Sequence, residues 1–347
     1  MPVGRLPGVT DLTETSPTIR PLDLLDPAQE QRAREWSQVH AAVQREQFGD
    51  KGSPFTLEER QAFQRAPEGR RVDRAAYVGG RLVGALEVAM PLTDNLEVAF
   101  LTLSVAAAAR RRGVGAALLR DAEQIAREHG RSILMVETEW AFVRADSAEG
   151  FARAHGYDVA QTSLRSELSL PVDRAPLRAV LEVRDDYAVE SFVDQMPGEW
   201  VAQRAVLQQR MSTDAPTDGM ALGEEAWDAE RLRGALERTL RSGRRIVETV
   251  ARHVSSGELV GFTQVHLPAH DPALAYQEDT LVLSEHRGHA LGLRLKAANA
   301  LLLMEVQPAV RSVRTWNSET NRPMLAVNRA LGYVIDGYER EWQKVLR

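Results

Sequence analysis

The chain has no cysteine among its 347 residues, and aromatic residues make up 6% of it. The absence of cysteine excludes disulfide bonds, thiolate metal ligands and a thiol nucleophile. No run of about 18 apolar residues is present, and the first residues, MPVGRLPGVTDL, contain no apolar segment of the kind found in signal peptides. We therefore expect a cytoplasmic protein with no membrane partner.

The eight histidines form no cluster with metal-ligand spacing. His266 and His270 are four residues apart, but Pro268 between them rules out a helix that would place both on one face. We expect no metal site. The formal net charge of −6 also differs from the basic character of most nucleic-acid-binding domains, so we expect no nucleic acid partner.

The most informative feature that is present is a loop between an expected strand and an expected helix. Residues 105–119 read VAAAARRRGVGAALL, in which three arginines are followed by two glycines. Such a loop turns backbone N–H groups toward one point at a helix N-terminus, where a phosphate binds. Residues 282–292, VLSEHRGHALG, form a second loop of this kind. Two such loops predict a duplicated fold, although a solvated basic turn is the alternative for the arginines.

The order of expected elements repeats as well. The first half has expected strands at 18–22, 74–78, 81–89, 95–105, 132–138 and 157–170, and expected helices at 27–47, 56–65, 114–129 and 147–154. The second half has expected strands at 244–253, 259–267, 276–283 and 312–316, helices at 290–306 and 322–331, and a terminal strand pair at 333–346. Residues 197–231 fit less well and are expected to form helices and a loop over one face.

The length favours two domains, at about 150 residues per domain. A Pro- and Gly-rich stretch at 1–16 predicts a flexible tail, and the first domain is expected at 17–170. Pro171 and Pro176 mark a linker at 171–177, and the second domain is expected at 178–347.

The loop spacing Arg-x-x-Gly-x-Gly, after a strand and before a helix, resembles the acetyl-CoA pyrophosphate loop of the GCN5-related N-acetyltransferase (GNAT) superfamily. The matching residues are Arg110, Gly113 and Gly115 in the first half and Arg287, Ala290 and Gly292 in the second. The resemblance implies an α/β fold of two tandem acyl-CoA N-acyltransferase domains, each a mixed, mostly antiparallel sheet flanked by helices.

The resemblance also implies acetyl-CoA (CoA) as cofactor and a splayed, bulged strand before each loop. The implied binding residues are Leu103, Ser104, Val105, Arg110, Arg111, Arg112, Gly113, Val114, Gly115 and Ala116 in the first half, and Leu281, Val282, Leu283, Arg287, Gly288, His289, Ala290, Leu291, Gly292, Asn321 and Asn328 in the second. Alanine at 290 is penalised if this position needs a positive φ, and it fits well if the position is simply the first helical turn. Asn321 before Arg322-Pro323 is equally a natural helix cap.

Acetyl transfer to an amine needs a base that keeps the attacking amine neutral. Glu278 and Asp279, just before the apolar stretch 280–283, are the candidates, with a solvated strand start as the alternative. Glu97 is the comparable acid of the first half. Many relatives carry a tyrosine four residues before a Gly-aromatic pair, where this chain has Ala152 and Asn328.

The proton for the leaving thiolate must then come from water, Tyr333 or Tyr338, and we take Tyr338 as the catalytic candidate. The resemblance thus predicts an acetyl-CoA-dependent N-acetyltransferase that acts by direct attack of a small-molecule amine. Catalysis is favoured in the second half, and one half need not be catalytic. A CoA-binding regulatory or structural module on a decayed fold, and a protein acetyltransferase, are the alternatives. A monomer and a homodimer are both open.

Overall fold

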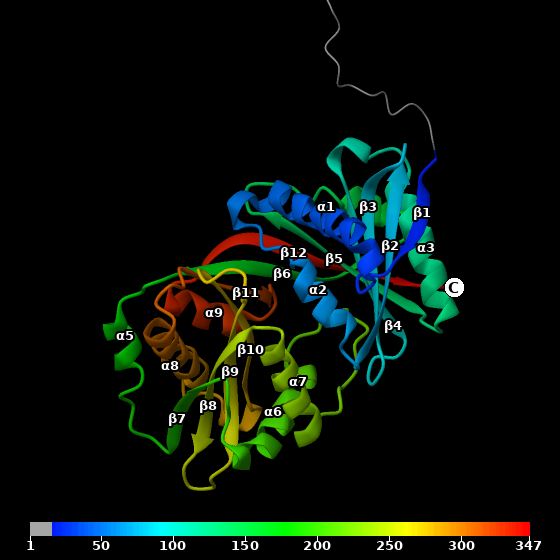
Figure 1. The fold of residues 1–347 in the computed structure, drawn as a ribbon. Coiled ribbons are helices and arrows are strands. Elements are labelled where there is room, and N and C mark those ends of the chain that lie inside the picture. The colour runs from blue at the N-terminus through cyan, green and yellow to red at the C-terminus, as the bar shows by residue number, and fades with distance from the viewer. Residues whose placement is uncertain (1–15) are drawn as a thin grey trace, which may run out of the picture.

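The computed structural model describes residues 16–347, so the predicted tail at 1–16 lies outside it except for Ser16. The first half contains β1 (Thr18–Leu22), α1 (Glu30–Phe48), α2 (Leu57–Gln64), β2 (Gly69–Val78), β3 (Arg81–Pro91), β4 (Val98–Val105), α3 (Val114–Glu128), β5 (Ile133–Ala141), α4 (Glu149–Ala154) and β6 (Asp158–Ser169). The second half contains α5 (Arg174–Ala179), β7 (Tyr187–Val193), α6 (Val201–Asp214), α7 (Ala229–Arg241), β8 (Arg245–His253), β9 (Leu259–Leu267), β10 (Leu274–Val282), α8 (Leu291–Val306), β11 (Ser312–Ser318), α9 (Arg322–Leu331) and β12 (Val334–Val345). Figure 1 shows the two halves as two lobes.

Local signals in the sequence explain where several of these helices start and stop. Thr56 and Glu59 form a capping box, in which each side chain accepts a hydrogen bond from the other residue's backbone N–H. Asn321 caps α9 by accepting a hydrogen bond from the N–H of Met324, and Gly332, with φ of 93°, ends that helix. The segment at 197–231 contains α6 and the start of α7, as expected. α5 begins inside the predicted linker 171–177, and its Leu177 is buried.

The twelve strands of the described residues form one continuous sheet in the order β1-β2-β3-β4-β5-β12-β6-β11-β10-β9-β8-β7. Counted inward from its two ends, the sheet has corresponding strands of the two halves at the same position, such as β1 and β7 at the edges or β5 and β11 near the centre. The molecule therefore has an approximate two-fold axis between β12 and β6, which pair antiparallel. This mixed sheet with flanking helices confirms the predicted fold class.

The last strand of each half lies against the central strand of the other half. β12 pairs with β5 from Gly337↔Ala141 to Val345↔Ile133, and β6 pairs with β11 over its last residues. In Figure 1, β12 (red) runs into the lobe that contains β5. The prediction of a terminal strand pair at 333–346 was wrong. These residues form one long strand, β12, which pairs with β6 on one side and with β5 on the other. Residues 158–169 likewise form one strand.

Trp342 shows why this exchange matters for stability. Its side chain is fully buried in the core of the first half, which packs α3 against β2–β5. The indole Nε1 donates a hydrogen bond to Oγ1 of Thr138 on β5, 2.9 Å away. Truncating a buried tryptophan typically costs about 3–5 kcal/mol. The second half therefore supplies a substantial part of the stability of the first.

The helices cover both faces of the sheet. α1 packs with Trp36 and Val39 against β2 and β3, while α3 packs on the other face of the same strands. α6 and α8 cover the two faces of the second half in the same way. No helix of residues 16–347 is long and apolar enough to cross a membrane, and no group of three or more His, Asp or Glu there could hold a metal.

Candidate functional site

The two predicted phosphate loops follow the same backbone course. Each has two residues with left-handed backbone conformation, at Arg111 and Gly113 in the first loop (φ of 61° and 78°) and at Gly288 and Ala290 in the second (φ of 92° and 53°). Position 290 thus requires a positive φ, and alanine is strained there. Glycine occupies one of the two left-handed positions in each loop, but not the same one.

The helices that follow these loops begin without a side-chain cap. No side chain of the described residues caps α3 after Gly113 or α8 after Ala290. The first N–H groups of a helix have no partner within the helix, and together with the helix dipole they attract an anion. Val114 and Leu291, the first residues of these helices, point into the core, so that only their backbone is available to a ligand.

Arg110 and Arg287 stand at equivalent positions in the two loops and have a structural role. The Nε of Arg110 donates to the carbonyl of Val105, 3.0 Å away, and its two terminal nitrogens bind the Glu46 carboxylate at 2.8 and 2.6 Å. This pair lowers the pKa of Glu46. Arg287 repeats the contact with the last carbonyl of β10, at 3.1 Å, and faces Asp214 of α6 at 3.4 Å. Both arginines therefore hold their loop against its strand, while Arg111, Arg112 and His289 remain exposed.

The strands before the loops separate from their neighbours, as the resemblance implies. β4 pairs with β5 only from Val98 to Leu101, and β10 pairs with β11 only from Leu274 to Tyr276. The predicted binding segments at 103–105 and 281–283 lie beyond this pairing. In the first half the Ser104 hydroxyl is already bonded to Nδ1 of the buried His40, 2.9 Å away.

A β-bulge distinguishes the second half from the first. The register of β10 against β9 shifts by one residue between Gln277 and Thr280, so that Glu278 and Asp279 lie in the bulge. β4 pairs with β3 in continuous register from Val105 to Phe100. β4 also contains no acidic residue, and Glu97 precedes it as an exposed residue.

Glu278 is a partly exposed carboxylate beside a neutral imidazole. The Oε1 of Glu278 lies 3.5 Å from Nδ1 of His266 on β9, and 40% of the Glu278 side chain is exposed. Partial burial, and secondly the Asp279 carboxylate, raise the pKa of Glu278 to about 7. Burial and the nearby Arg244 and Arg204 lower the pKa of His266 to about 4. Glu278 is therefore the group that titrates near neutral pH, as a general base should.

Asp279 is held by the protein rather than left free. Its Oδ2 accepts a hydrogen bond from Nε2 of Gln208 on α6, 2.9 Å away. Gln208 in turn accepts one from Nη1 of Arg204 at 3.0 Å, and Arg204 is fixed by buried Glu248 at 2.5 Å. Of the two predicted acids, Glu278 is thus the one available to a substrate.

Asn328, where the resemblance implies a tyrosine, belongs to a buried polar chain. Nζ of Lys296 donates to Oδ1 of Asn328 at 2.5 Å, and Nδ2 of Asn328 donates to Oδ1 of Asn317 at 2.7 Å. Burial lowers the pKa of Lys296 to about 7. The Asn328 amide is therefore engaged at both ends, and the Asn321 side chain serves as the α9 cap.

The structure does not bring Tyr338 together with Glu278 and Asp279. Tyr338 lies on β12, where its ring stacks on Trp140 and Phe142 with centroids 5.4 and 5.8 Å apart. Between β12 and β10 lie β6 and β11, which separate the two strands by about 14 Å at the usual strand spacing. Tyr338 thus faces the first half, and Tyr333 packs against the core near α8.

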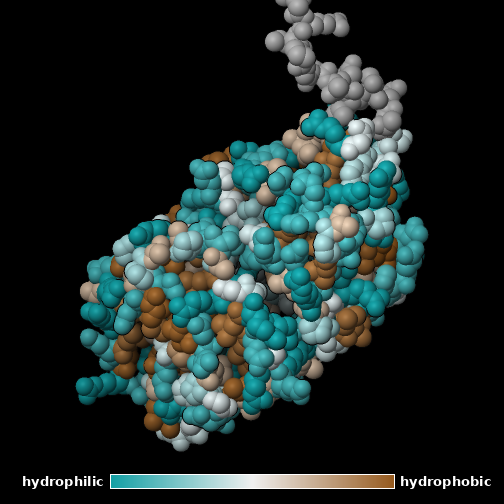
Figure 2. Space-filling view, in the orientation of Figure 1, coloured by the Kyte–Doolittle hydropathy of each residue, from teal (hydrophilic) through white to brown (hydrophobic). Residues whose placement is uncertain are grey.

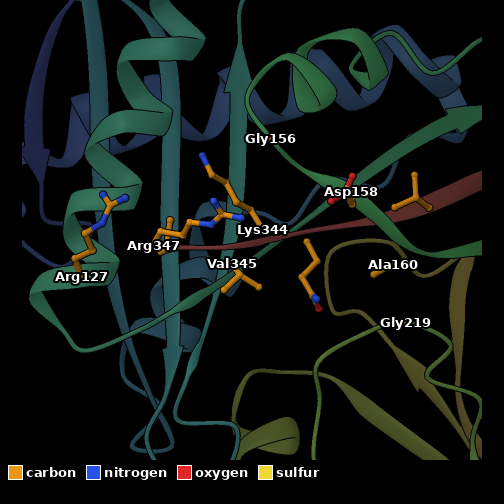
Figure 3. A pocket seen from close by; sticks show the side chains of 11 residues that line it. Arg127, Gly156, Asp158, Ala160, Gly219, Lys344, Val345 and Arg347 are labelled. Atoms are coloured by element: carbon orange, nitrogen blue, oxygen red, sulfur yellow. The ribbon is translucent and has the colours of Figure 1, made fainter.

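His266, Arg244 and Lys296 were not among the predicted site residues. Gln264 and His266 are two residues apart on β9, so they lie on the same face of the sheet. This spacing of two was a usable signal in the sequence, whereas a search for helical spacing was not. A cavity of about 580 Å³ lies elsewhere, at the end of β12, lined by Arg127, Asp158, Gly219 and Lys344 among others (Figure 3). It contains none of the predicted residues.

Comparisons with known proteins agree with this geometry. The model of the acetyltransferase (GNAT) family matches residues 35–157. A tandem GNAT protein from the clavulanic acid biosynthesis pathway is 29% identical, over 95% of this chain and 98% of that chain, with a TM-score of 0.78. No curated protein matches the sequence.

Two further solved structures share the fold. A GCN5-related N-acetyltransferase from Sphaerobacter thermophilus is 18% identical, with a TM-score of 0.66 and 98% coverage of both chains. The glucosamine N-acetyltransferase region of a fungal multi-domain GH3 β-N-acetylglucosaminidase is 16% identical, over 98% of this chain and 40% of that chain, with a TM-score of 0.69.

Proposed function

We propose that this chain is a tandem GNAT acyltransferase that moves an acetyl group from acetyl-CoA to the amine of a small molecule. The match of the GNAT family model to residues 35–157 and the similarity to a tandem GNAT protein over 95% of the chain support this proposal. We place catalysis in the second half. The observation that carries this proposal is Glu278, a carboxylate in the bulge of β10 with a pKa raised to about 7 beside neutral His266.

The residues of the second half fit the phosphates and arm of CoA. The N–H groups at the start of α8 lack a side-chain cap, and Gly288 has open space where a side chain would stand. The edge of β10 that faces β11 has no strand partner after Tyr276. Residues 287–292 would hold the pyrophosphate and 281–283 the pantetheine arm. When bound, acetyl-CoA supplies the thioester carbonyl that the amine attacks.

The protein's own part in the reaction is to prepare the amine. An alkyl amine is an ammonium ion near neutral pH and cannot attack until it loses a proton. Glu278, ionised above about pH 7, accepts that proton on its carboxylate, and His266 stays neutral beside it. We assign no side chain as donor to the leaving group, since Asn328 is bonded at both ends and Tyr338 lies on the other half.

The first half retains the loop but lacks the base. Its α3 begins without a side-chain cap, as α8 does, but β4 has no bulge and no acidic residue. We propose that this half is non-catalytic, and that it either binds CoA without turnover or serves as a structural partner.

Two measurements test this proposal. Calorimetric titration with acetyl-CoA should give at least one site per chain, and the Gly292→Arg variant should lose the site of the second half. Release of free CoA thiol, followed with a panel of primary amines, should depend on both the amine and Glu278. Binding without release for every amine would favour a regulatory CoA-binding module, and transfer only to a basic peptide pool would favour a protein acetyltransferase.

A further inference from the structure

The start of α2, in the first half, is fixed to the second half. The Glu59 carboxylate accepts a hydrogen bond from the N–H of Thr56 at 2.9 Å and, through Oε1, one from Nη2 of Arg244 at 2.7 Å. Nδ1 of His270 lies 3.5 Å from its other oxygen. The Glu59 side chain is only 7% exposed. The buried Glu59 carboxylate thus caps α2 and links it to two segments of the second half. One contains Arg244, just before β8, and the other contains His270, just after β9.

The loop before α2 makes aromatic and polar contacts with the same region. The Ser53 side chain lies close to the hydroxyl of Tyr276 on β10, whose pKa is raised by burial. The guanidinium of Arg244 lies 5.8 Å from the ring centroid of Phe55 and 6.0 Å from that of Tyr276. The rings of Tyr276 and Trp316 of β11 are stacked, with their centroids 6.2 Å apart. Loop 52–56 therefore faces the sheet of the second half.

These contacts bring Phe55 of the first half and Tyr276 of the second half to the same guanidinium, that of Arg244. Tyr276 precedes Glu278 by two residues on β10, and the positive charge of Arg244 is close enough to counteract the rise in the pKa of Glu278. α2 lies where the two lobes meet in Figure 1, and the surface in Figure 2 is hollowed at this junction. Phe55 is 45% exposed, although the polar residues beside it are buried. A large apolar ring left open beside Arg244, whose charge reaches Glu278, is suited to contact with a ligand.

We propose that the first half builds one wall of the acceptor site of the second half, and that Phe55 selects amines that carry an apolar or aromatic group. This inference rests on the proposed function. Glu278 accepts the proton of the acceptor's ammonium group, and the rings of Phe55 and Tyr276 contact the apolar part of the acceptor. Glu59 and Ser53 are positioning residues, because they hold Arg244 and Tyr276 rather than the substrate. The first half then has a role in the reaction without a catalytic base of its own.

The experiment compares Phe55→Ala and Phe55→Leu with the unmodified chain, using ethylamine, butylamine and phenethylamine as acceptors. We expect Phe55→Ala to raise KM for phenethylamine about 10- to 100-fold, the usual range for losing one apolar contact in a pocket. KM for ethylamine, kcat and the affinity for acetyl-CoA should change little. Phe55→Leu should give an intermediate preference. Val183→Ala, which truncates another exposed apolar side chain in the segment between α5 and β7, is the matched control.

The outcomes separate the inference from the proposed function. A ratio of KM values between phenethylamine and ethylamine that is unchanged in Phe55→Ala, with transfer intact, would overturn the inference and leave the function standing. Equal effects of Phe55→Ala and Val183→Ala would overturn it as well. Absence of transfer by the unmodified chain to all three amines and to a wider panel would overturn the proposed function and this inference with it.

Discussion

Ala290 and Gly113 occupy equivalent positions, at the N-caps of α8 and α3, and both have left-handed backbone conformation, with φ of 53° and 78°. An alanine in this conformation costs about 1–2 kcal/mol, which the greater flexibility of glycine in the unfolded chain offsets by about 0.5–1 kcal/mol. This position therefore strains the backbone of the second loop, where it is alanine, but not that of the first loop, where it is glycine.

Ala290→Gly is therefore expected to stabilise the protein by about 0.5–1 kcal/mol, and Gly113→Ala to destabilise it by a similar amount. Gly113 has nothing within 4 Å of where a Cβ would stand, so no clash adds to the backbone strain. Denaturant titration of both variants measures the difference. Destabilisation by Ala290→Gly would contradict the strain argument.

Replacement of Glu278 should change the pH profile as well as the rate. A base whose pKa is raised to about 7 is active in its ionised form, so kcat/KM should rise through about pH 7 to a plateau. Glu278→Gln should lower kcat about 10²- to 10⁴-fold, the usual contribution of a general base, and abolish this rise.

Asp279→Asn is the matched comparison, since its carboxylate is already bonded to Gln208. We expect a smaller loss of kcat for this variant, with the rise near pH 7 retained. A rise retained in Glu278→Gln and lost in Asp279→Asn would exchange the roles of the two acids.

The sequence predicted most elements because their signals are local. The strand-loop-helix pattern with Gly113 located α3, and Asn321 with Pro323 located α9 at its observed bounds. The exchange of β6 and β12 could not be predicted in this way. An alternating pattern shows that a segment forms a strand, but it does not identify the neighbouring strand.

The same distinction between local signals and partners distant in sequence applies to the candidate site. Glu278 and Asp279 could be proposed from the sequence because acids beside an apolar strand are a local feature. Arg110 could not be seen as a structural residue, because its partner Glu46 lies 64 residues away on α1. Tyr338 is close to α9 in sequence, but β12 carries it to the other half.

Lys296 should leave a signature in the dependence of stability on pH. Burial lowers its pKa to about 7 from an ordinary 10.5, so between these values the unfolded chain holds a proton that the folded chain has lost. The contribution of Lys296 to the free energy of unfolding therefore rises as the pH increases from about 7 to about 10.5.

The Lys296→Met variant should lack this rise, which thermal unfolding at pH 6, 8 and 10 would show as a difference from the unmodified chain. Asn321→Ala removes an amide that does not contact Lys296 and is the control for general weakening of α9. An unchanged pH dependence in Lys296→Met would mean that the buried amine does not titrate as expected.

Four glutamates face one another across β5 and β12, and they should have the opposite effect on stability. Glu341 lies opposite Glu137, and Glu339 lies opposite Glu139. None of the four forms a salt bridge within residues 16–347. Burial, and secondly Glu137, raise the pKa of Glu341 to about 9 from an ordinary 4.5. The folded chain then holds a proton that the unfolded chain loses, so the stability contributed below about pH 4.5 is lost as the pH rises to about 9.

Glu341→Gln removes this titration and should raise the unfolding temperature at pH 8.5 by several degrees, at about 2–4 °C for each kcal/mol. Near pH 4.5 the variant and the unmodified chain should differ little, because Glu341 is protonated in the folded state at that pH and resembles the amide. Glu305→Gln, on the exposed surface of α8, is the matched control and should shift the unfolding temperature equally at both pH values. A Glu341→Gln variant that is less stable at pH 8.5 would mean that its ionised carboxylate is held by a partner, such as a cation, rather than repelled by its neighbours.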